Sequence, residues 1–163
     1  MSDAPFAGPL NGSLFGEDNV CFGCAVDHPF GFRMDVEREG DGVLAQVQPE
    51  AHHQGPLGLV HGGLLMTLAD EIGAWAVIAE TGKFGFTTGF SGRLVGPARV
   101  AEPIECRARA LGPIERTAQV EVKLAQGTRA VLEGTFDFAL LGRRAAERLL
   151  GRALPEAWLA LAR

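Results

Sequence analysis

The residue with the clearest potential for chemistry is Asp70, a carboxylate inside a long apolar stretch. The stretch runs from Leu64 to Ala79 and contains two acidic residues, Asp70 and Glu71. A helix that is apolar on every side is normally buried on all faces, and a carboxylate in such a place is costly unless it is paired. Asp70 is therefore either a structural acid held by a partner or an acid kept for chemistry.

Helical geometry separates Asp70 from the main apolar face of this stretch. At about 100° per residue, Asp70 shares its face with Met66, Gly73 and Val77. Asp70 is thus expected to point toward a second dry surface, away from the core stripe. That core stripe contains Leu64, Leu65, Leu68, Ile72, Trp75 and Ala79.

Composition and charge exclude several classes of protein. At 163 residues with a net charge of −5, the chain is expected to be one globular domain without the clustered basic surface of a nucleic-acid-binding protein. The first residues lack a basic start followed by an apolar run, and no uninterrupted apolar run reaches the roughly 18 residues of a membrane span. The three cysteines form no disulfide framework, so a cytoplasmic location with reduced thiols is predicted.

The pattern along the chain predicts one buried helix between two groups of strands. Residues 1–30 are rich in Gly, Pro, Asn and Asp, which is typical of an irregular arm. Residues 31–141 form the main domain, with a hairpin over 32–47, a helix from 62 to about 81 and four alternating strands between 86 and 140. Residues 142–163 are predicted to be a helical tail interrupted at Pro155.

These elements predict an α+β fold in which an antiparallel β-sheet wraps around one long central α-helix. Each strand has one apolar and one polar face, as in a sheet covered on one side. In the strand that ends at Pro97, Thr88, Phe90 and Leu94 are predicted to face the core, and Thr87 the opposite side. A curled sheet still leaves one flank of the helix open, so a partner subunit is expected.

Two sequence stretches resemble a known family. Cys21-Phe22-Gly23-Cys24, followed by His28-Pro29-Phe30-Gly31-Phe32, is similar to an opening found in one branch of the hotdog-fold thioesterases. The run from Gln54 to Gly63, with Asp70 nine positions after His61, resembles the central motif of the PaaI-like acyl-CoA thioesterases. The resemblance covers roughly residues 20 to 140.

The resemblance implies the hydrolysis of acyl-CoA to free acid and CoA, by a homodimer that often pairs into a homotetramer. It implies no cofactor apart from the coenzyme A of the substrate. The net charge and the lack of an apolar span predict neither a nucleic acid nor a membrane as partner. The backbone N–H of Gly62 would polarise the thioester carbonyl, Asp70 would act as general base or nucleophile, and Thr87 would orient the attacking water. The resemblance and its motif assign substrate binding to Gln54, His61, Gly63 and Thr88.

Helix geometry agrees with a site shared between subunits. Gly62 and Asp70 are eight residues apart, which is about 12 Å along a helix. One helix could not aim both groups at the same thioester carbon. Two antiparallel helices across a dimer axis could, because each would bring its N-terminus to the Asp70 of the other.

The sequence also allows alternatives to this hypothesis. Cys21 and Cys24 could hold zinc with His28 and one of His52 or His53, but a packed loop is favoured and no metal site is predicted. His52 and His53 are expected to be solvated loop residues. A non-catalytic acyl-CoA-binding module and a hydroxyacyl-thioester dehydratase of the same fold are the alternative functions.

Overall fold

The structure is a computed structural model that describes residues 10–159. The chain order is strand, hairpin, long helix, four strands and two short helices. The elements are β1 (Leu10–Asn11), a 3-10 turn (Gly12–Phe15), β2 (Asp35–Glu39), β3 (Gly42–Val47), a second 3-10 turn (Ala51–His53), α1 (Gly62–Thr81), β4 (Phe84–Leu94), β5 (Ile104–Ala110), β6 (Thr117–Gln126), β7 (Arg129–Leu141), α2 (Arg143–Leu150) and α3 (Glu156–Leu159).

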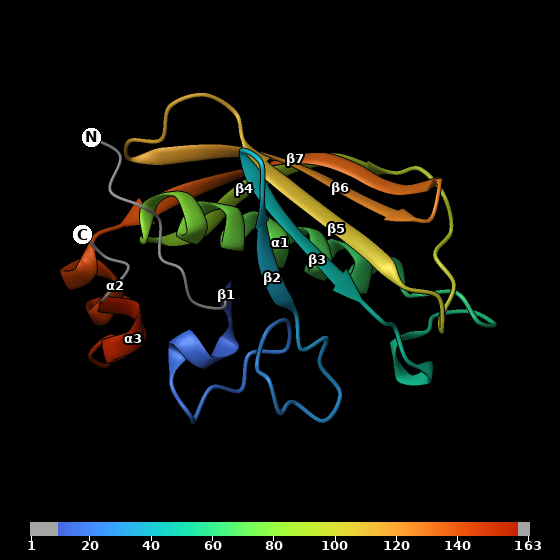
Figure 1. Cartoon of the computed structure of the whole chain (residues 1–163), viewed down its shortest axis with the longest axis horizontal. Coiled ribbons are helices and arrows are strands. Elements are labelled where there is room, and N and C mark those ends of the chain that lie inside the picture. The colour runs from blue at the N-terminus through green and yellow to red at the C-terminus, as the bar shows by residue number, and fades with distance from the viewer. Residues whose placement is uncertain (1–9, 160–163) are drawn as a thin grey trace.

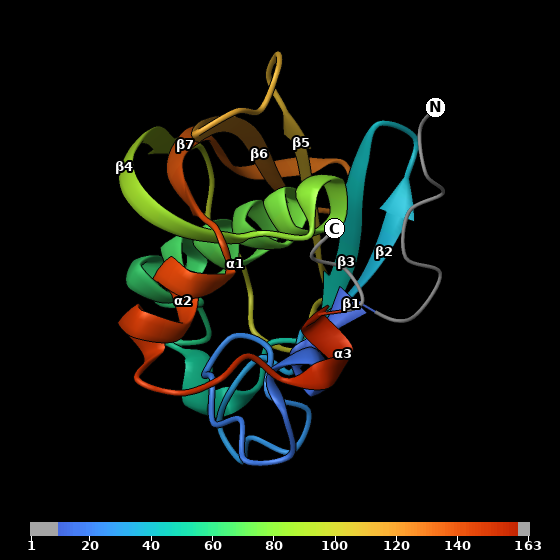
Figure 2. The same ribbon diagram turned by 90° about the vertical axis from the view of Figure 1, so that its left-hand side faces the viewer.

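The strands form one antiparallel sheet that curls around α1. The strand order is β1-β2-β3-β5-β6-β7-β4, so β4 lies at one edge of the sheet. Figure 1 shows α1 running beneath the sheet, and Figure 2 shows β4 and β7 on one side of the helix and β2 and β3 on the other. The predicted fold class, an antiparallel sheet wrapped around one long helix, is confirmed.

The inner face of the sheet supplies most of the core against α1. Alternate residues of β5, β6 and β7 are buried, as the apolar pattern predicts, because successive side chains of a strand point to opposite faces. The buried set includes Ile104, Cys106, Ala108, Ala118, Val120, Val122, Leu124, Leu132, Phe136 and Phe138.

The two ends of α1 lie where the sequence predicts them. The Gly63 N–H donates to His61 Nδ1 at 2.9 Å, which caps the first turn. Gly82 ends the helix in the left-handed region with φ 64°. By its length and apolar composition, α1 could cross a membrane. However, 56% of its most apolar 18-residue segment is buried inside the fold. The apolar character of α1 therefore fits a core helix.

The residues of β4 that face the core differ from those predicted from the sequence. Thr87 lies opposite Phe138 of β7 on the inner face, whereas Thr88 is exposed. A register shift between Thr87 and Gly89 inserts one extra residue, so Phe90 and Leu94 also oppose inner-face residues of β7. The sequence predicts that Thr88 and Phe90 face the core and that Thr87 points to the other face of the strand. That prediction is wrong for both threonines, because the β-bulge interrupts the strict alternation of faces.

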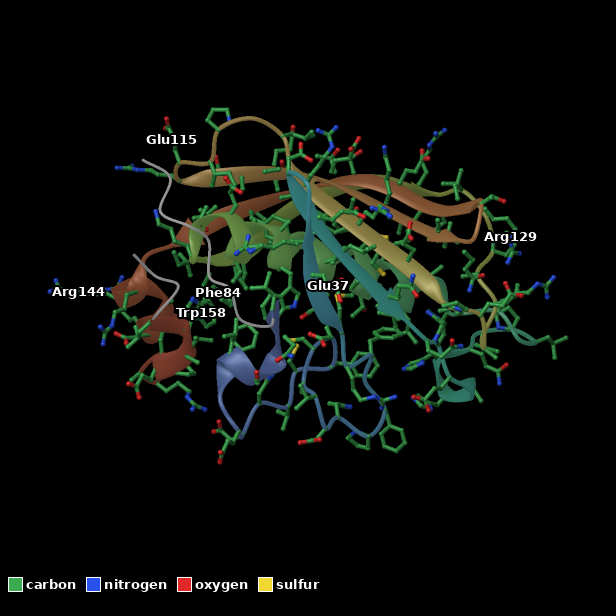
Figure 3. The ribbon with its side chains drawn as sticks, viewed as in Figure 1. Glu37, Phe84, Glu115, Arg129, Arg144 and Trp158 are labelled. Carbon is green, nitrogen blue, oxygen red and sulfur yellow. The ribbon has the colours of Figure 1, made fainter. Side chains whose placement is uncertain are left out.

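The N-terminal arm and the C-terminal tail cover α1 on the side away from the sheet. Figures 1 and 2 show the 3-10 turn of the arm, α2 and α3 below the helix. Trp158 of α3 is buried, its ring lies 4.7 Å from that of Phe15, and its Nε1 donates to the Gly82 carbonyl at 3.1 Å. Figure 3 shows Trp158 beside Phe84 of β4. The tail is thereby anchored to the C-terminal end of α1.

The burial of α1 can be tested with two leucine substitutions. Leu68 is fully buried, so Leu68→Ala is expected to lower the free energy of unfolding by about 2–5 kcal/mol through lost apolar burial and a residual cavity. Leu57 is 98% exposed, and Leu57→Ala is expected to change the free energy of unfolding by less than about 0.5 kcal/mol. Urea unfolding of both variants measures the difference. Equal effects of the two substitutions would contradict the placement of α1.

Candidate active site

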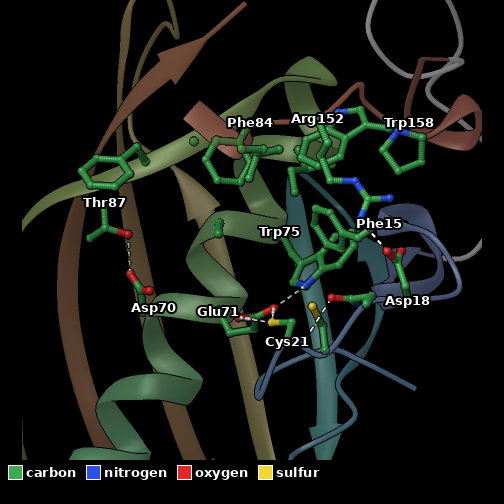
Figure 4. A pocket seen from close by; sticks show the side chains of 18 of the residues that line it. Phe15, Asp18, Cys21, Asp70, Glu71, Trp75, Phe84, Thr87, Arg152 and Trp158 are labelled. Carbon is green, nitrogen blue, oxygen red and sulfur yellow. Dashed lines mark hydrogen bonds and ion pairs between the residues drawn. The ribbon is translucent and has the colours of Figure 1, made fainter. Parts of the chain in front are cut away.

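Asp70 and Thr87 meet through a direct hydrogen bond between α1 and β4. The Thr87 hydroxyl donates to Asp70 Oδ1 at 2.6 Å, and both residues are half-buried (Figure 4). Asp70 therefore has a hydroxyl partner from the sheet edge, and its other oxygen accepts no hydrogen bond within residues 10–159. The structure thus brings together two of the three residues that were predicted to be catalytic.

The Asp70–Thr87 pair lies in the wall of a cavity of about 650 Å³. The cavity is bounded by α1, β4, the N-terminal arm and the C-terminal tail, and its size is that of a site for a small organic ligand. Asp70 and Thr87 supply polar groups, while rings from four different segments supply apolar surface (Figure 4). Those rings belong to Phe15, Trp75, Phe84 and Trp158.

Glu71 contributes to the same cavity but faces the N-terminal arm. Its Oε1 accepts a hydrogen bond from Trp75 Nε1 at 3.1 Å and lies 3.8 Å from Cys21 Sγ. Burial raises the pKa of the Glu71 carboxyl to about 7. Glu71 therefore keeps its proton to a much higher pH than an exposed glutamate does.

Cys21 and Cys24 lie beside Glu71. In the sequence, the two cysteines are considered together with histidines, but their contact with Glu71 is not predicted. A hydrogen bond with the Cys24 side chain lowers the pKa of the Cys21 thiol to about 6, and the same contact raises the pKa of Cys24. The Cys-x-x-Cys spacing is visible in the sequence. The contact with Glu71, 50 positions away from Cys21, comes only from the packing of the arm against α1.

The residues around the start of α1 form a second group of predicted site residues. The Gln54 side chain accepts from the Gly58 N–H at 2.9 Å and His61 caps the helix, so both shape the loop that leads into α1. The Gly62 N–H donates to no acceptor within the described part of the chain. Gln54, His61, Gly62 and Gly63 do not line the cavity at Asp70, and neither does Thr88, whose hydroxyl donates to the Asp137 carbonyl.

The histidines lie apart from the cysteines. His53 Nε2 is 2.8 Å from the Phe30 carbonyl oxygen, and its ring stacks on Phe32. His53 is buried, so the prediction that it is solvated is wrong, while His52 is exposed as predicted. His28 packs edge-on against Phe22. The zinc set of Cys21, Cys24 and histidines is therefore not assembled.

Comparisons of sequence point to one family. The family model described as "Thioesterase superfamily" matches residues 57–133, which include the start of α1, Asp70 and Thr87. A comparison with curated protein sequences finds no match.

Solved structures with the same fold include several thioesterases. A hypothetical thioesterase from Streptococcus pneumoniae TIGR4, solved with coenzyme A, is 22% identical with a TM-score of 0.62, covering 67% of this chain and 89% of that one. Zebra fish thioesterase superfamily member 2 is 24% identical with a TM-score of 0.62, covering 71% and 90%. A Streptococcus mutans UA159 protein bound to acetyl CoA is 20% identical with a TM-score of 0.61, covering 67% and 89%.

Proposed function

We propose that this chain, which has the hotdog fold and whose residues 57–133 match the thioesterase superfamily, hydrolyses acyl-CoA thioesters to free acid and coenzyme A. The observation that carries the proposal is the hydrogen bond between Thr87 and Asp70 in a cavity wall. A purely structural carboxylate would gain little from facing a cavity, whereas a reacting one must be accessible to its substrate.

Asp70 is the group that activates water in this proposal. The Thr87 hydroxyl donates its proton to Asp70, which leaves the hydroxyl oxygen free to accept a hydrogen bond from a water molecule. That water would lie beside the second carboxylate oxygen. Water adds to the thioester carbon while its proton passes to Asp70; the C–S bond then breaks and the proton passes to the departing thiolate. Direct attack by Asp70, through a mixed anhydride that water hydrolyses, is the alternative.

Glu71 is less suited to this task than Asp70. Its carboxyl is held by Trp75 and Cys21 and keeps its proton up to about pH 7, because burial raises its pKa. A protonated acid cannot accept a proton from water. We therefore assign the chemistry to Asp70, although the two acids are adjacent in sequence.

The Gly62 N–H is the proposed donor to the thioester oxygen, and it comes from a second subunit. Free N–H groups at a helix N-terminus suit the negative charge that develops on that oxygen. Two inner-face residues of the edge strand β4, Phe90 and Leu94, are 62% and 52% exposed. An uncovered apolar inner face beside α1 supports a homodimer in which a second α1 lies against the first.

The acyl group fits the aromatic end of the cavity. Trp158 and Phe15 close the cavity at the far side from Asp70, and both come from segments outside residues 57–133. Apolar rings favour an acyl chain or an aryl group over a charged one. The arm and the tail would then set the substrate range, while α1 and β4 supply the chemistry.

The role of Asp70 is tested by Asp70→Asn. The amide keeps the size of the side chain but cannot take a proton from water, so kcat is expected to fall by about 10²–10⁴-fold. Steady-state cleavage of acyl-CoA and aryl-CoA substrates, with the released thiol as signal, measures this. A variant that keeps nearly the full rate would move the chemistry away from Asp70. If the wild type binds acyl-CoA without cleaving it, the protein is a binding module.

The role of the Thr87 hydroxyl is tested by Thr87→Val. Valine keeps the shape and removes only the hydroxyl, so kcat is expected to fall about 10–100-fold with KM nearly unchanged, as for a contact made mainly in the transition state. Thr117→Val is the matched control, because Thr117 is an exposed strand residue that does not line the cavity. Equal rates for both variants would show that the Thr87 hydroxyl has no part in catalysis.

The shared site is tested with Gly62→Pro. Proline at the first position of a helix keeps the helix but removes the N–H, and the preceding residue, His61, already has the extended conformation that proline requires. Loss of one such donor is expected to lower kcat by about 10²–10³-fold.

Co-expression then distinguishes a shared site from a site within one chain. When the Gly62→Pro and Asp70→Asn chains are expressed together, half of the dimers are mixed and each mixed dimer has one intact site. About a quarter of the wild-type activity should therefore return. No recovery in a preparation that contains mixed dimers would contradict the shared site.

A further inference from the structure

Cys21, Cys24 and Glu71 form a cluster that the proposed hydrolysis does not use. One ligand atom of each residue, two thiol sulfurs and a carboxylate oxygen, lies within 4.8 Å of the other two. Cys24 is buried, and the other two are half-buried. Figure 4 shows Cys21 next to Glu71. The cluster joins a loop of the N-terminal arm to the middle of α1.

The loop is folded so that both sulfurs face the same side. The Ala25 N–H donates to the Cys21 carbonyl at 3.0 Å, which closes a tight turn over the five residues from Cys21 to Ala25. A Cys-x-x-Cys turn that directs two sulfurs to one point is the common way in which proteins present paired thiolates to zinc.

The third group is held in place by the helix and by the loop. Trp75 Nε1 donates to Glu71 Oε1. A hydrogen bond of this kind, from a residue that is not itself a ligand, fixes the orientation of a metal-binding carboxylate. A Cβ atom on Gly23 would lie 2.4 Å from the Glu71 carboxyl carbon, so the backbone of the loop presses directly against this group. The position of Glu71 relative to the two sulfurs is therefore set by packing on two sides.

The cluster lacks a positive charge. Within residues 10–159, no Lys or Arg forms an ion pair with Glu71. All three residues also line the cavity, so one direction from the cluster is open to a water molecule. A loop that only had to pack would be served better by an apolar side chain than by a buried carboxyl.

We propose that Cys21, Cys24 and Glu71 bind a divalent cation of the zinc type, with a water molecule from the cavity as the fourth ligand. Two thiolates, one carboxylate and one open position match the tetrahedral N, S and O coordination of Zn²⁺, and the sulfurs disfavour Mg²⁺ and Ca²⁺. Binding would fasten the N-terminal arm to α1 one residue away from Asp70. The proposal does not depend on the proposed hydrolysis.

Cobalt substitution tests the site on the full-length protein. After treatment with a chelator under reducing conditions, one equivalent of Co²⁺ should give thiolate-to-cobalt charge-transfer bands and the visible bands of tetrahedral Co²⁺. One equivalent of Zn²⁺ should displace it. One equivalent of Zn²⁺ should also raise the thermal unfolding temperature, because a ligand that binds only the folded state stabilises it.

Matched variants locate the site. Cys21→Ser, Cys24→Ser and Glu71→Gln should each lower the affinity for Co²⁺, whereas Cys106→Ser, at the buried cysteine of β5, should keep one tight site with both sets of bands. Trp75→Phe should weaken binding about 10–100-fold, because it leaves the three ligands and removes only the contact that orients Glu71. Glu71→Gln keeps the size of the side chain, so it tests the site even if a serine variant fails to fold.

Three outcomes would overturn the proposal. The first is the absence of thiolate bands with one equivalent of Co²⁺ on the reduced protein. The second is tight binding that survives loss of both Cys21 and Cys24, which would identify an adventitious site. The third is a thermal unfolding temperature that one equivalent of Zn²⁺ leaves unchanged.

Discussion

The burial of α1 is the constraint on which the rest of the structure depends. Its residues are apolar nearly all round, and one sheet can cover only part of a helix. The sheet therefore curls, and the arm and tail cover the C-terminal half from the other side, where Trp158 hydrogen-bonds to Gly82. Beside the N-terminal half, Phe90 and Leu94 remain uncovered. The same demand that shapes the fold thus leaves an apolar surface uncovered, which the proposed second copy would cover.

Two neighbouring acids on α1 have different environments because a helix turns about 100° per residue. Asp70 faces the sheet edge and a hydroxyl, whereas Glu71 faces the arm, an indole N–H and a thiol. Burial raises the pKa of Glu71, while Asp70 keeps an oxygen that is free to accept a proton. The two proposals made for this helix, water activation by Asp70 and cation binding by Glu71, therefore rest on different side chains.

The cavity combines residues from inside and outside the segment that matches the thioesterase superfamily. The segment that matches the thioesterase superfamily, residues 57–133, carries Asp70 and Thr87, and the arm and tail outside it carry Phe15 and Trp158. Aromatic rings from the arm and tail can change without disturbing the hydrogen bond between α1 and β4. In the proposed function, this arrangement would separate the range of acyl groups from the chemistry of the thioester.

The sequence by itself determined the elements and the ends of the helix, because apolar periodicity and the glycine at Gly82 are local signals. The resemblance also predicted that Asp70 and Thr87 act together, and the structure joins their side chains by a hydrogen bond. Only the tertiary structure decided the faces of β4, because the bulge after Thr87 breaks the alternation that a sequence displays. The burial of His53 against Phe32 and the meeting of Glu71 with Cys21 and Cys24 were likewise decided by packing between distant segments, which leaves no trace in local spacing.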